Sequence, residues 1–199
     1  MPVRSLFATR IYEADLEEEP LLGELAHSIR SLAEDDEAGR QWSKDHRYAG
    51  YTSYASLNDL PRRDPAFDDL SKVLLRHASR FADECAFDLK RKPRLDSLWV
   101  NLLKGGGHHS GHIHPNSIIS GTFYVEVPPG SGAIRFEDPR LPSMMAAPSR
   151  RKDAPLELQP FVTVEPRRGL LLLWESWLRH EVLPGKARGE RLSISFNFA

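Results

Sequence analysis

The second half of the chain consists of short apolar segments in which apolar and polar residues alternate. Clusters of glycine and proline at 128–132, 166–169 and 184–189 separate these segments and are typical of turns. Alternation with a period of two predicts strands with one buried face. The predicted strands are 95–103, 118–127, 133–136, 161–164, 170–174, 181–183 and 191–198.

Two amphipathic helices are predicted ahead of this β-rich half. Apolar residues recur at helical spacing over residues 21–34. A second helix is expected after Asp64, which is a good N-cap, with Pro65 in the first helical position. We interpret His77, on the apolar stripe of this helix, and Cys85, near its end, as packing residues.

Three other segments carry weaker patterns. Residues 5–12 are predicted to form a short strand, and residues 41–55 an extended edge segment or a loop. Residues 144–155 are predicted to form a polar, basic loop. Segments 41–55 and 144–155 are the candidates for specificity loops. Helices followed by many antiparallel strands favour an α+β chain, a barrel or jelly roll with helices on one sheet.

Bulk properties exclude several classes of protein. The 199 residues suit one domain, 1–199, and the net charge of -1 predicts neither nucleic acid nor an anionic membrane as a partner. We see no signal peptide pattern and no apolar run of membrane-spanning length. With Cys85 as the single cysteine, no disulfide can form within the chain, and we expect a cytoplasmic location.

Histidines provide a candidate metal site. His112 and His114 are two apart, so in a strand both project to the same side. His180, next to a predicted strand, is the natural third ligand, and imidazoles suit iron, copper, nickel and zinc alike. His108 and His109 precede the strand in a glycine-rich loop, and one of them is expected to face the pocket without binding metal.

The last predicted strand has one apolar and one polar face. Its polar face either points to water or lines the interior of the barrel. In the second case Arg191 can bind a carboxylate through two hydrogen bonds, with the Ser193 hydroxyl as a third donor. The apolar residues are Leu192, Ile194, Phe196 and Phe198, and the polar residues are Arg191, Ser193, Ser195 and Asn197.

These motifs, in this order, resemble the iron(II)- and 2-oxoglutarate-dependent dioxygenases, and in particular a bacterial group of uncharacterised oxygenases with an H-x-H-P motif. The matching motifs are His112-Ile-His114, the strand segment 120–124, His180 and Arg191-Leu-Ser193. The segment 132–139 also resembles a strand of this family that begins with glycine. The resemblance covers about residues 95–198. It implies a double-stranded β-helix (jelly roll) core with supporting N-terminal helices.

The resemblance also implies cofactors and a reaction. The cofactors are Fe(II), 2-oxoglutarate as co-substrate, and O2. The expected outcome is hydroxylation of an unactivated C–H bond of a small molecule or a peptide side chain, with release of succinate and CO2. His112, His114 and His180 would bind the metal, and Arg191, Ser193, Tyr124 and Asn101 would line the site of the co-substrate.

One departure from the family pattern concerns the metal ligands. The family usually has aspartate at the position of His114. Either His112, His114 and His180 bind iron as a three-histidine face, or only two histidines bind and Asp138 or a water completes the shell. We favour the first reading and interpret Asp138 as a turn residue or as an acceptor that orients an imidazole.

Two other classes of function remain open from the sequence. A cupin-type metalloenzyme without a keto acid also uses H-x-H on a jelly roll, but it would require a glutamate soon afterwards and would not explain Arg191 and Ser193. A non-enzymatic β-sandwich that binds a ligand is the other alternative. The sequence leaves the substrate and the oligomeric state open, with a homodimer as one option.

Overall fold

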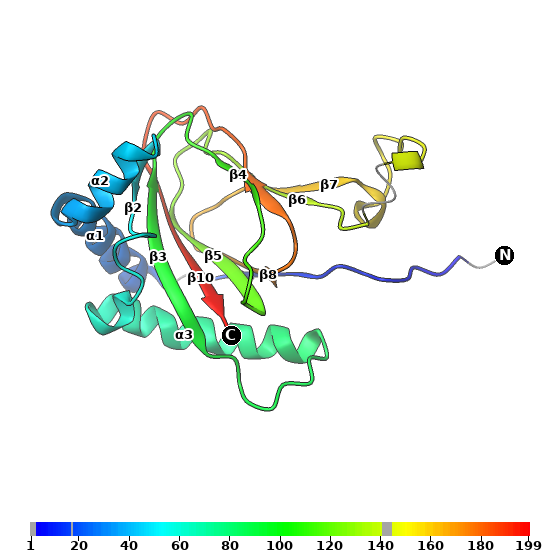
Figure 1. The fold of residues 1–199 in the computed structure, drawn as a ribbon, viewed down its shortest axis with the longest axis horizontal. Coiled ribbons are helices and arrows are strands. Elements are labelled where there is room, and N and C mark those ends of the chain that lie inside the picture. The colour runs from blue at the N-terminus through cyan, green and yellow to red at the C-terminus, as the bar shows by residue number, and fades with distance from the viewer. Residues whose placement is uncertain (1–2, 17, 141–144) are drawn as a thin grey trace.

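Two antiparallel sheets and a layer of helices make up the protein, seen in a computed structural model that describes residues 3–16, 18–140 and 145–199 (Figure 1). The elements are β1 (Ile11–Asp15), α1 (Glu19–Asp35), α2 (Glu37–Asp45), β2 (Gly50–Thr52), η1 (Leu60–Arg62), α3 (Pro65–Glu84), β3 (Leu95–Leu103), β4 (His109–His112), β5 (Ile119–Glu126), β6 (Ile134–Glu137), η2 (Leu156–Leu158), β7 (Phe161–Val164), β8 (Leu170–Glu175), β9 (His180–Val182) and β10 (Arg191–Phe198).

The larger sheet has the strand order β1-β8-β5-β10-β3-β2, and the smaller has the order β4-β9-β6-β7. Strands that neighbour each other in these sheets pair antiparallel, and most are distant in sequence. This arrangement of two facing antiparallel sheets confirms the expected α+β class with a jelly-roll core. All the strands predicted after residue 93 are present, and β3, β7 and β10 have the predicted bounds.

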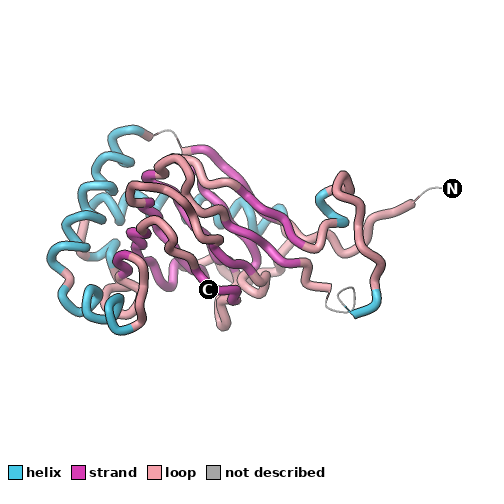
Figure 2. Tube along the Cα trace, turned by 90° about the horizontal axis from the view of Figure 1, so that it is seen from above, coloured by secondary structure: helices cyan, strands magenta, loops and turns pink. Residues whose placement is uncertain are grey.

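Helices α1 and α3 cover the outer face of the larger sheet, and Figure 2 shows the helices gathered on that side. Leu25 and Ile29 of α1 are fully buried there. The start of α3 is as predicted, because the Asp64 carboxylate accepts a 2.9 Å hydrogen bond from the backbone N–H of Ala66. His77 is half-buried and is hydrogen-bonded to the hydroxyl of Tyr12.

Strand β10 lies in the middle of the larger sheet and separates the helix-packed core from the interior between the sheets. Its apolar residues are buried in the core shared with α1 and α3, and its polar residues line the cavity described below. The polar face therefore points inward, so the reading in which it faces water is wrong. The apolar residues are Leu192, Ile194, Phe196 and Phe198, and the polar ones are Arg191, Ser193, Ser195 and Asn197.

The prediction of a strand at residues 5–12 is wrong. Residues 3–10 are exposed and extend away from the body of the protein, and the strand β1 begins at Ile11 (Figure 1). Ile11 is the first residue with a partner in β8, where it pairs with Trp174. A strand needs such a neighbour, and the apolar pattern of residues 5–12 does not reveal where the neighbour begins.

The prediction of an extended edge segment or a loop at residues 41–55 is wrong for residues 41–45, which are helical, and correct for residues 50–52, which form an edge strand. Helix α2 continues to Asp45, whereas β2 is an edge strand of the larger sheet. The polar sequence of α2 shows no apolar stripe. Its first turn is held by Asp36, whose carboxylate accepts hydrogen bonds from the N–H of Gly39 and from the hydroxyls of Tyr51 and Ser56.

Within the described residues, no helix is both long and apolar enough to span a bilayer.

Candidate metal centre and its cavity

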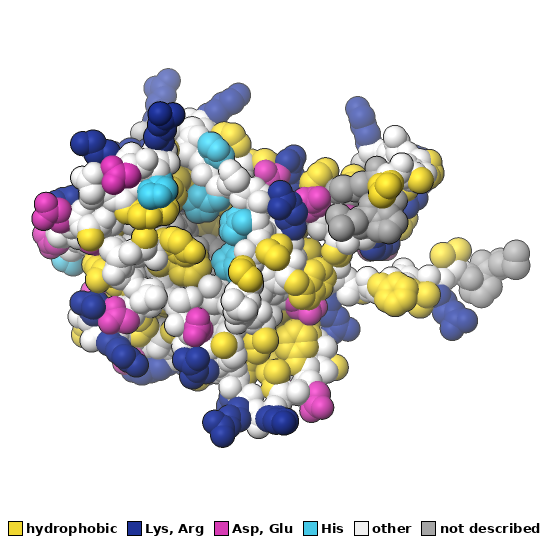
Figure 3. Space-filling view, viewed as in Figure 1, with side chains coloured by type: hydrophobic (Ala, Val, Ile, Leu, Met, Phe, Trp, Pro, Cys, Tyr) yellow, Lys and Arg dark blue, Asp and Glu magenta, His cyan; other side chains and the backbone are white. Residues whose placement is uncertain are grey.

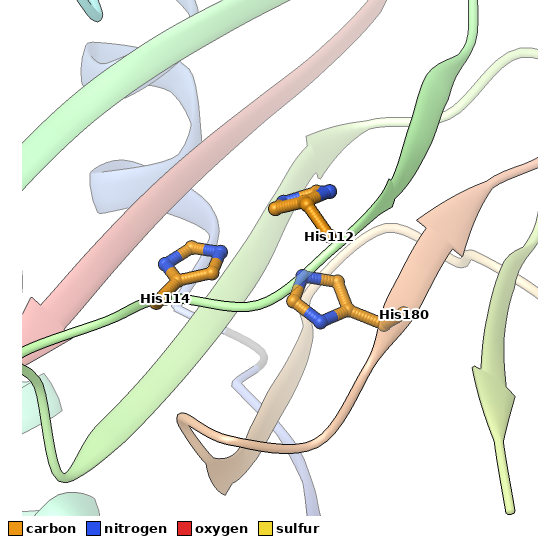
Figure 4. Close-up of side chains that lie close together, drawn as sticks. All are labelled: His112, His114 and His180. Atoms are coloured by element: carbon orange, nitrogen blue, oxygen red, sulfur yellow. The ribbon is translucent and has the colours of Figure 1, made fainter.

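Three histidine rings meet between the two sheets. His112 is the last residue of β4, His180 is the first residue of β9, and His114 lies two residues beyond β4 (Figure 4). Their ring centroids are 4.4 to 5.1 Å apart. One ring nitrogen from each lies within 4.8 Å of the other two, which is close enough for the three rings to surround a single ion. The structure thus brings together the three histidines predicted from the sequence.

In each of these rings Nδ1 is held by the protein, and no hydrogen bond among the described residues involves Nε2. Nδ1 of His112 lies 2.7 Å from the carbonyl of Ser110, and Nδ1 of His180 lies 2.9 Å from the carbonyl of Leu178. A carbonyl oxygen can only accept, so in both rings Nδ1 carries the proton and Nε2 carries the lone pair. This is the tautomer that binds a metal through Nε2.

His114 shows the same pattern with a side chain as its partner. Its Nδ1 lies 2.7 Å from the Asn197 side-chain oxygen, and its buried Nε2 has no hydrogen-bond partner among the described residues. Asn197 is itself fixed, since it accepts from the Ser120 hydroxyl and donates to the Ser97 hydroxyl. The backbone N–H of His114 donates to the carbonyl of Ser176. A buried nitrogen without a hydrogen-bond partner, on a residue held by two hydrogen bonds, is suited to bind a metal ion.

Strand β4 does not position its histidines as the sequence predicted. His114 lies outside the strand, and His109, expected in a loop, begins it. Residues 109 and 112 would point to opposite faces of a regular strand, yet both line the cavity. The pairing with β9 is irregular between them, and such a bulge re-aims side chains. His108 is exposed, as expected for the one of the pair that turns away.

Burial favours the neutral form of His180 and of His114. It lowers the pKa of His180 to about 3, with smaller effects from the neighbouring rings. It also lowers the pKa of His114, although the hydrogen bond that His114 donates to the side-chain oxygen of Asn197 partly opposes the shift. Imidazoles that are already deprotonated at neutral pH bind a metal ion without having to release a proton.

Arg191 lies in the same cavity. It is 3% exposed, and its Nη1 donates to the carbonyl of Gly132 at 2.9 Å. Its guanidinium carbon lies 5.7 Å from the centre of the Tyr124 ring. Its Nε has no hydrogen-bond partner, and no carboxylate pairs with it among the described residues. A buried guanidinium without a counter-ion is costly, so this end of the cavity is suited to an anion.

Unpaired polar atoms gather in this one cavity. In the part of the chain that the structure describes, three buried side-chain atoms lack a hydrogen-bond partner, namely His114 Nε2, Trp174 Nε1 and Arg191 Nε. All three residues line the same space of about 340 Å³. Its lining contains no aspartate, glutamate or lysine among the described residues. The arrangement therefore offers a metal position, two N–H donors and a positive charge to a bound acid.

A polar network that the sequence did not predict lies near Arg191. The side-chain oxygen of Asn101 accepts from the hydroxyls of Thr52 and Tyr48, and its amide donates to Ser195. The Tyr48 hydroxyl is also 2.9 Å from Nε2 of His109. Asn101 thus lines the cavity as expected, but its polar atoms are already bonded. Tyr48 and Thr52 lie in a segment whose pattern gave no sign of this role.

Aromatic residues form one wall of the cavity. Trp99 of β3 stacks beside His114 at 6.0 Å between ring centres, and Tyr54 lies edge-on to Trp99 at 5.4 Å. Trp42 of α2 continues the row at 6.2 Å from Tyr54. Figure 3 shows histidines around a hollow in this face of the molecule, with hydrophobic side chains beside it.

Three residues near the cavity differ in their surroundings. Trp174 is a buried wall residue, whereas Trp177 is 47% exposed and is not part of the wall or core. Its indole N–H donates to the Glu175 carboxylate. Asp138 does not line the cavity among the described residues; its carboxylate accepts from the backbone and the guanidinium of Arg140.

Comparison with known proteins agrees with this geometry. A search of curated proteins gives no significant match. Among solved structures, a Pseudomonas putida prolyl-4-hydroxylase is 19% identical with a TM-score of 0.64, and the match covers 96% of this chain and 92% of that chain. The epimerase SnoN from nogalamycin biosynthesis, solved with Fe3+, alpha ketoglutarate and nogalamycin RO, is 16% identical with a TM-score of 0.66 over 96% and 78% of the two chains.

HygX from Streptomyces hygroscopicus, solved with nickel and 2-oxoglutarate, is 17% identical with a TM-score of 0.55 over 96% and 82% of the two chains. At these identities the likeness shows a shared fold. A family model described as "Putative 2OG-Fe(II) oxygenase" matches residues 97–197, which is half of the chain and includes all three histidines and Arg191. The three-histidine cluster fits Fe(II), since neutral imidazole is a suitable ligand for iron. The chain therefore belongs to the 2OG-Fe(II) oxygenase family.

Proposed function

We propose that this protein is an iron(II)- and 2-oxoglutarate-dependent oxygenase that hydroxylates an unactivated C–H bond of a small molecule or a peptide side chain. The observation that carries the proposal is the shared cavity, in which three imidazoles with free nitrogens and an unpaired buried guanidinium lie together. We further propose that residues 1–199 form a single oxygenase domain, because α1 and α3 share one core with the larger sheet.

In this proposal His112, His114 and His180 hold Fe(II) through Nε2. The carbonyls of Ser110 and Leu178 and the side chain of Asn197 keep each ring in the right tautomer and orientation. The set differs from the two-histidine, one-carboxylate arrangement common among non-heme iron oxygenases. Three neutral ligands leave the full charge of the ion to be balanced by what binds next to it.

The distal carboxylate of 2-oxoglutarate is assigned to Arg191, with Ser193 and the Tyr124 hydroxyl as further donors. All three line the cavity, and both Arg191 and Tyr124 are almost completely buried. Burial raises the pKa of Tyr124 to about 12, which keeps the hydroxyl protonated as a donor. Asn101 has no free polar atom to offer the co-substrate, and it instead fixes the lining residues Tyr48 and Ser195 through hydrogen bonds.

When bound, iron, O2 and 2-oxoglutarate together supply the oxidation, in which the keto acid is converted to succinate and CO2 and one oxygen atom is inserted into the substrate C–H bond. The chain contributes orientation and the exclusion of water. Trp99 and Trp174 are buried in the cavity wall beside His114 and His180, where they limit solvent access.

Family membership and Arg191 favour this proposal over a cupin-type metalloenzyme without a keto acid and over a non-enzymatic β-sandwich. The test is anaerobic loading of the purified chain with Fe(II), followed by 2-oxoglutarate, ascorbate and O2, with succinate as the product measured. We expect succinate release that requires both iron and the keto acid. Its absence from an iron-loaded, folded protein contradicts the assignment.

Arg191→Ala tests the co-substrate site separately. Loss of a hydrogen bond to a charged group typically costs 1.5–3 kcal/mol, so the 2-oxoglutarate concentration for half-maximal binding should rise about tenfold to 100-fold. Fe(II) affinity should change far less. Arg188→Ala, which removes an exposed arginine before the same strand, is the matched control and should leave 2-oxoglutarate binding unchanged. Equal affinities for Arg191→Ala and the wild type contradict the assignment of Arg191.

A further inference from the structure

A second hollow adjoins the mouth of the metal cavity. It has a volume of about 450 Å³ and is lined by residues 87–89, by residues 113–118, and by Glu175 and Trp177. Residues 113–115, which include His114, line both this outer groove and the inner cavity. The two hollows therefore share one short segment of the chain as a common wall, and that segment carries a candidate metal ligand.

Large apolar side chains are exposed along the outer groove. Trp177 is 47% exposed, Ile113 is 48% exposed and Leu89 is 37% exposed. Single exposed apolar residues are ordinary, but a group of them beside a cavity is typical of a binding surface. The inner cavity has an exposed aromatic residue of its own, Tyr54, which lies next to Trp99, and Trp99 stacks beside His114. Apolar contacts are thus available in both hollows.

The two hollows differ in charge. The outer groove is lined by the carboxylates of Asp88 and Glu175, and no lysine or arginine lines it among the described residues. The inner cavity has Arg191 and, within the same part of the chain, no carboxylate. A ligand that occupies both would therefore place neutral or acidic groups inside and a basic group outside.

Size also separates the two hollows. The inner cavity of about 340 Å³ must hold the co-substrate at its Arg191 end as well as the group to be oxidised. Ligand pockets usually measure about 300–1,000 Å³, so what remains inside suits one side chain rather than a whole large substrate. The outer groove adds about 450 Å³ of space, and a substrate that fits entirely inside the inner cavity would leave it unused.

We propose that the substrate is an extended peptide, with an apolar residue inserted beside His114 and a basic residue in the outer groove near Asp88 and Glu175. This inference rests on the proposed oxygenase function and names its class of substrate. Trp99 and Tyr54 contact the inserted side chain, and Trp177 and Ile113 contact the residues that follow it. An extended chain is the form of substrate that can cross the segment 113–115 and occupy both hollows.

The test measures peptide binding and turnover separately. Two pools of short fluorescent peptides share a varied apolar residue at the centre; one pool has lysine or arginine at flanking positions, and the other has glutamate there. Fluorescence anisotropy reports binding to the full chain without metal. Succinate release by the iron-loaded chain reports turnover, and a pool of free amino acids serves as the small-molecule comparison.

We expect the basic pool to bind more tightly than the acidic pool and to stimulate succinate release above the level with free amino acids. Trp177→Ala should weaken binding of the basic pool about tenfold, as for a central aromatic contact. Asp88→Asn combined with Glu175→Gln should weaken it several-fold and reduce its salt dependence. Phe161→Ala removes an exposed aromatic residue that lines neither hollow and should have no effect. Circular dichroism checks that each variant is folded.

Equal binding of the two pools, or the same affinity for Trp177→Ala as for the wild type, overturns the proposal. So does turnover with free amino acids and no binding of peptides, and in that case the oxygenase assignment stands. Conversely, basic peptides that bind through Trp177 without any succinate release support the groove and contradict the oxygenase assignment. The two failures are therefore distinguishable.

Discussion

The side-chain oxygen of Asn197 lies 2.7 Å from Nδ1 of His114, although the two residues are 83 positions apart in the chain. The same oxygen accepts a 2.8 Å hydrogen bond from the hydroxyl of Ser120. An imidazole whose Nδ1 proton is held in this way has its Nε2 lone pair fixed in direction. The orientation of His114, just after β4, is thus set by Asn197 of β10.

Asn197→Ala should lower the affinity for Fe(II) about tenfold to 100-fold, because loss of an orienting partner of a metal-bound histidine usually has an effect of that size. Anaerobic calorimetric titration measures it. Asn197→Asp keeps an acceptor oxygen and should lose less. Asn58→Ala, at an exposed asparagine that lines neither hollow, is the control. An unchanged affinity for Asn197→Ala contradicts the role of this hydrogen bond.

Tyr48→Phe should lower the free energy of unfolding by about 1–3 kcal/mol. The change removes the hydroxyl that contacts both Nε2 of His109 and the side-chain oxygen of Asn101, and buried polar groups left unpaired cost about this much. Urea unfolding of the metal-free protein provides the measurement. Tyr54→Phe, at a 59% exposed tyrosine, should change stability by less than about 0.5 kcal/mol. If the two substitutions lower the free energy of unfolding equally, the hydrogen bonds of Tyr48 to His109 and Asn101 do not stabilise the protein.

The metal-free protein should lose stability as the pH falls from about 6.5 toward 3. Burial lowers the pKa of His109 and of His180 to about 3, so in this range the unfolded chain binds protons that the folded chain does not. Unfolding then becomes more favourable with acid, by at most about 1.4 kcal/mol per pH unit for each histidine.

Urea unfolding at pH 7 and pH 5 checks this dependence. His109→Gln should make stability less sensitive to pH, whereas His108→Gln, at an exposed histidine, should leave the sensitivity unchanged. If His109→Gln and the wild type lose the same amount of stability between pH 7 and pH 5, the lowered pKa of His109 is contradicted.

Asp36→Ala should destabilise the protein by about 2 kcal/mol. Asp36 is the N-cap of α2 and also accepts hydrogen bonds from Tyr51 and Ser56; an N-cap alone contributes about 1 kcal/mol. Because α2 carries Trp42 of the cavity wall, the change should also perturb the fluorescence of the native protein. Thermal unfolding is the measurement, and Asp35→Ala, at the exposed end of α1, is the control with little effect.

Much of the β-rich half could be predicted because its strands are short apolar segments, several with regular alternation, that end near glycine or proline. The alternation along β10 identified both the buried face and Arg191. The N-terminal strand was misplaced because its bounds depend on where β8 lies beside it, starting with the pair Ile11 and Trp174. Helix α2 was missed because a cap and tertiary hydrogen bonds stabilise it, rather than an apolar stripe.

The candidate site, too, could be predicted from the sequence only in part. The H-x-H spacing correctly grouped His112 with His114, but the reason was incomplete, since His114 lies beyond the strand and depends on Asn197. The sequence predicted that one of His108 and His109 faces the pocket, but not which one, and it gave no individual role to Tyr48. The positions of His109 and Tyr48 follow from a bulge in β4 and from the turn of the chain after α2, which only the folded structure shows.

One ion shared by three imidazoles is the central feature of the proposed site, and anaerobic titration with Fe(II) tests for it. We expect one Fe(II) per chain for the wild type and for His108→Ala, and at least about a 100-fold loss of affinity for His112→Ala, His114→Ala and His180→Ala, in keeping with the loss of a direct ligand rather than of an orienting partner. If His114→Ala instead binds one Fe(II) with the affinity of the wild type, the three-histidine centre is contradicted.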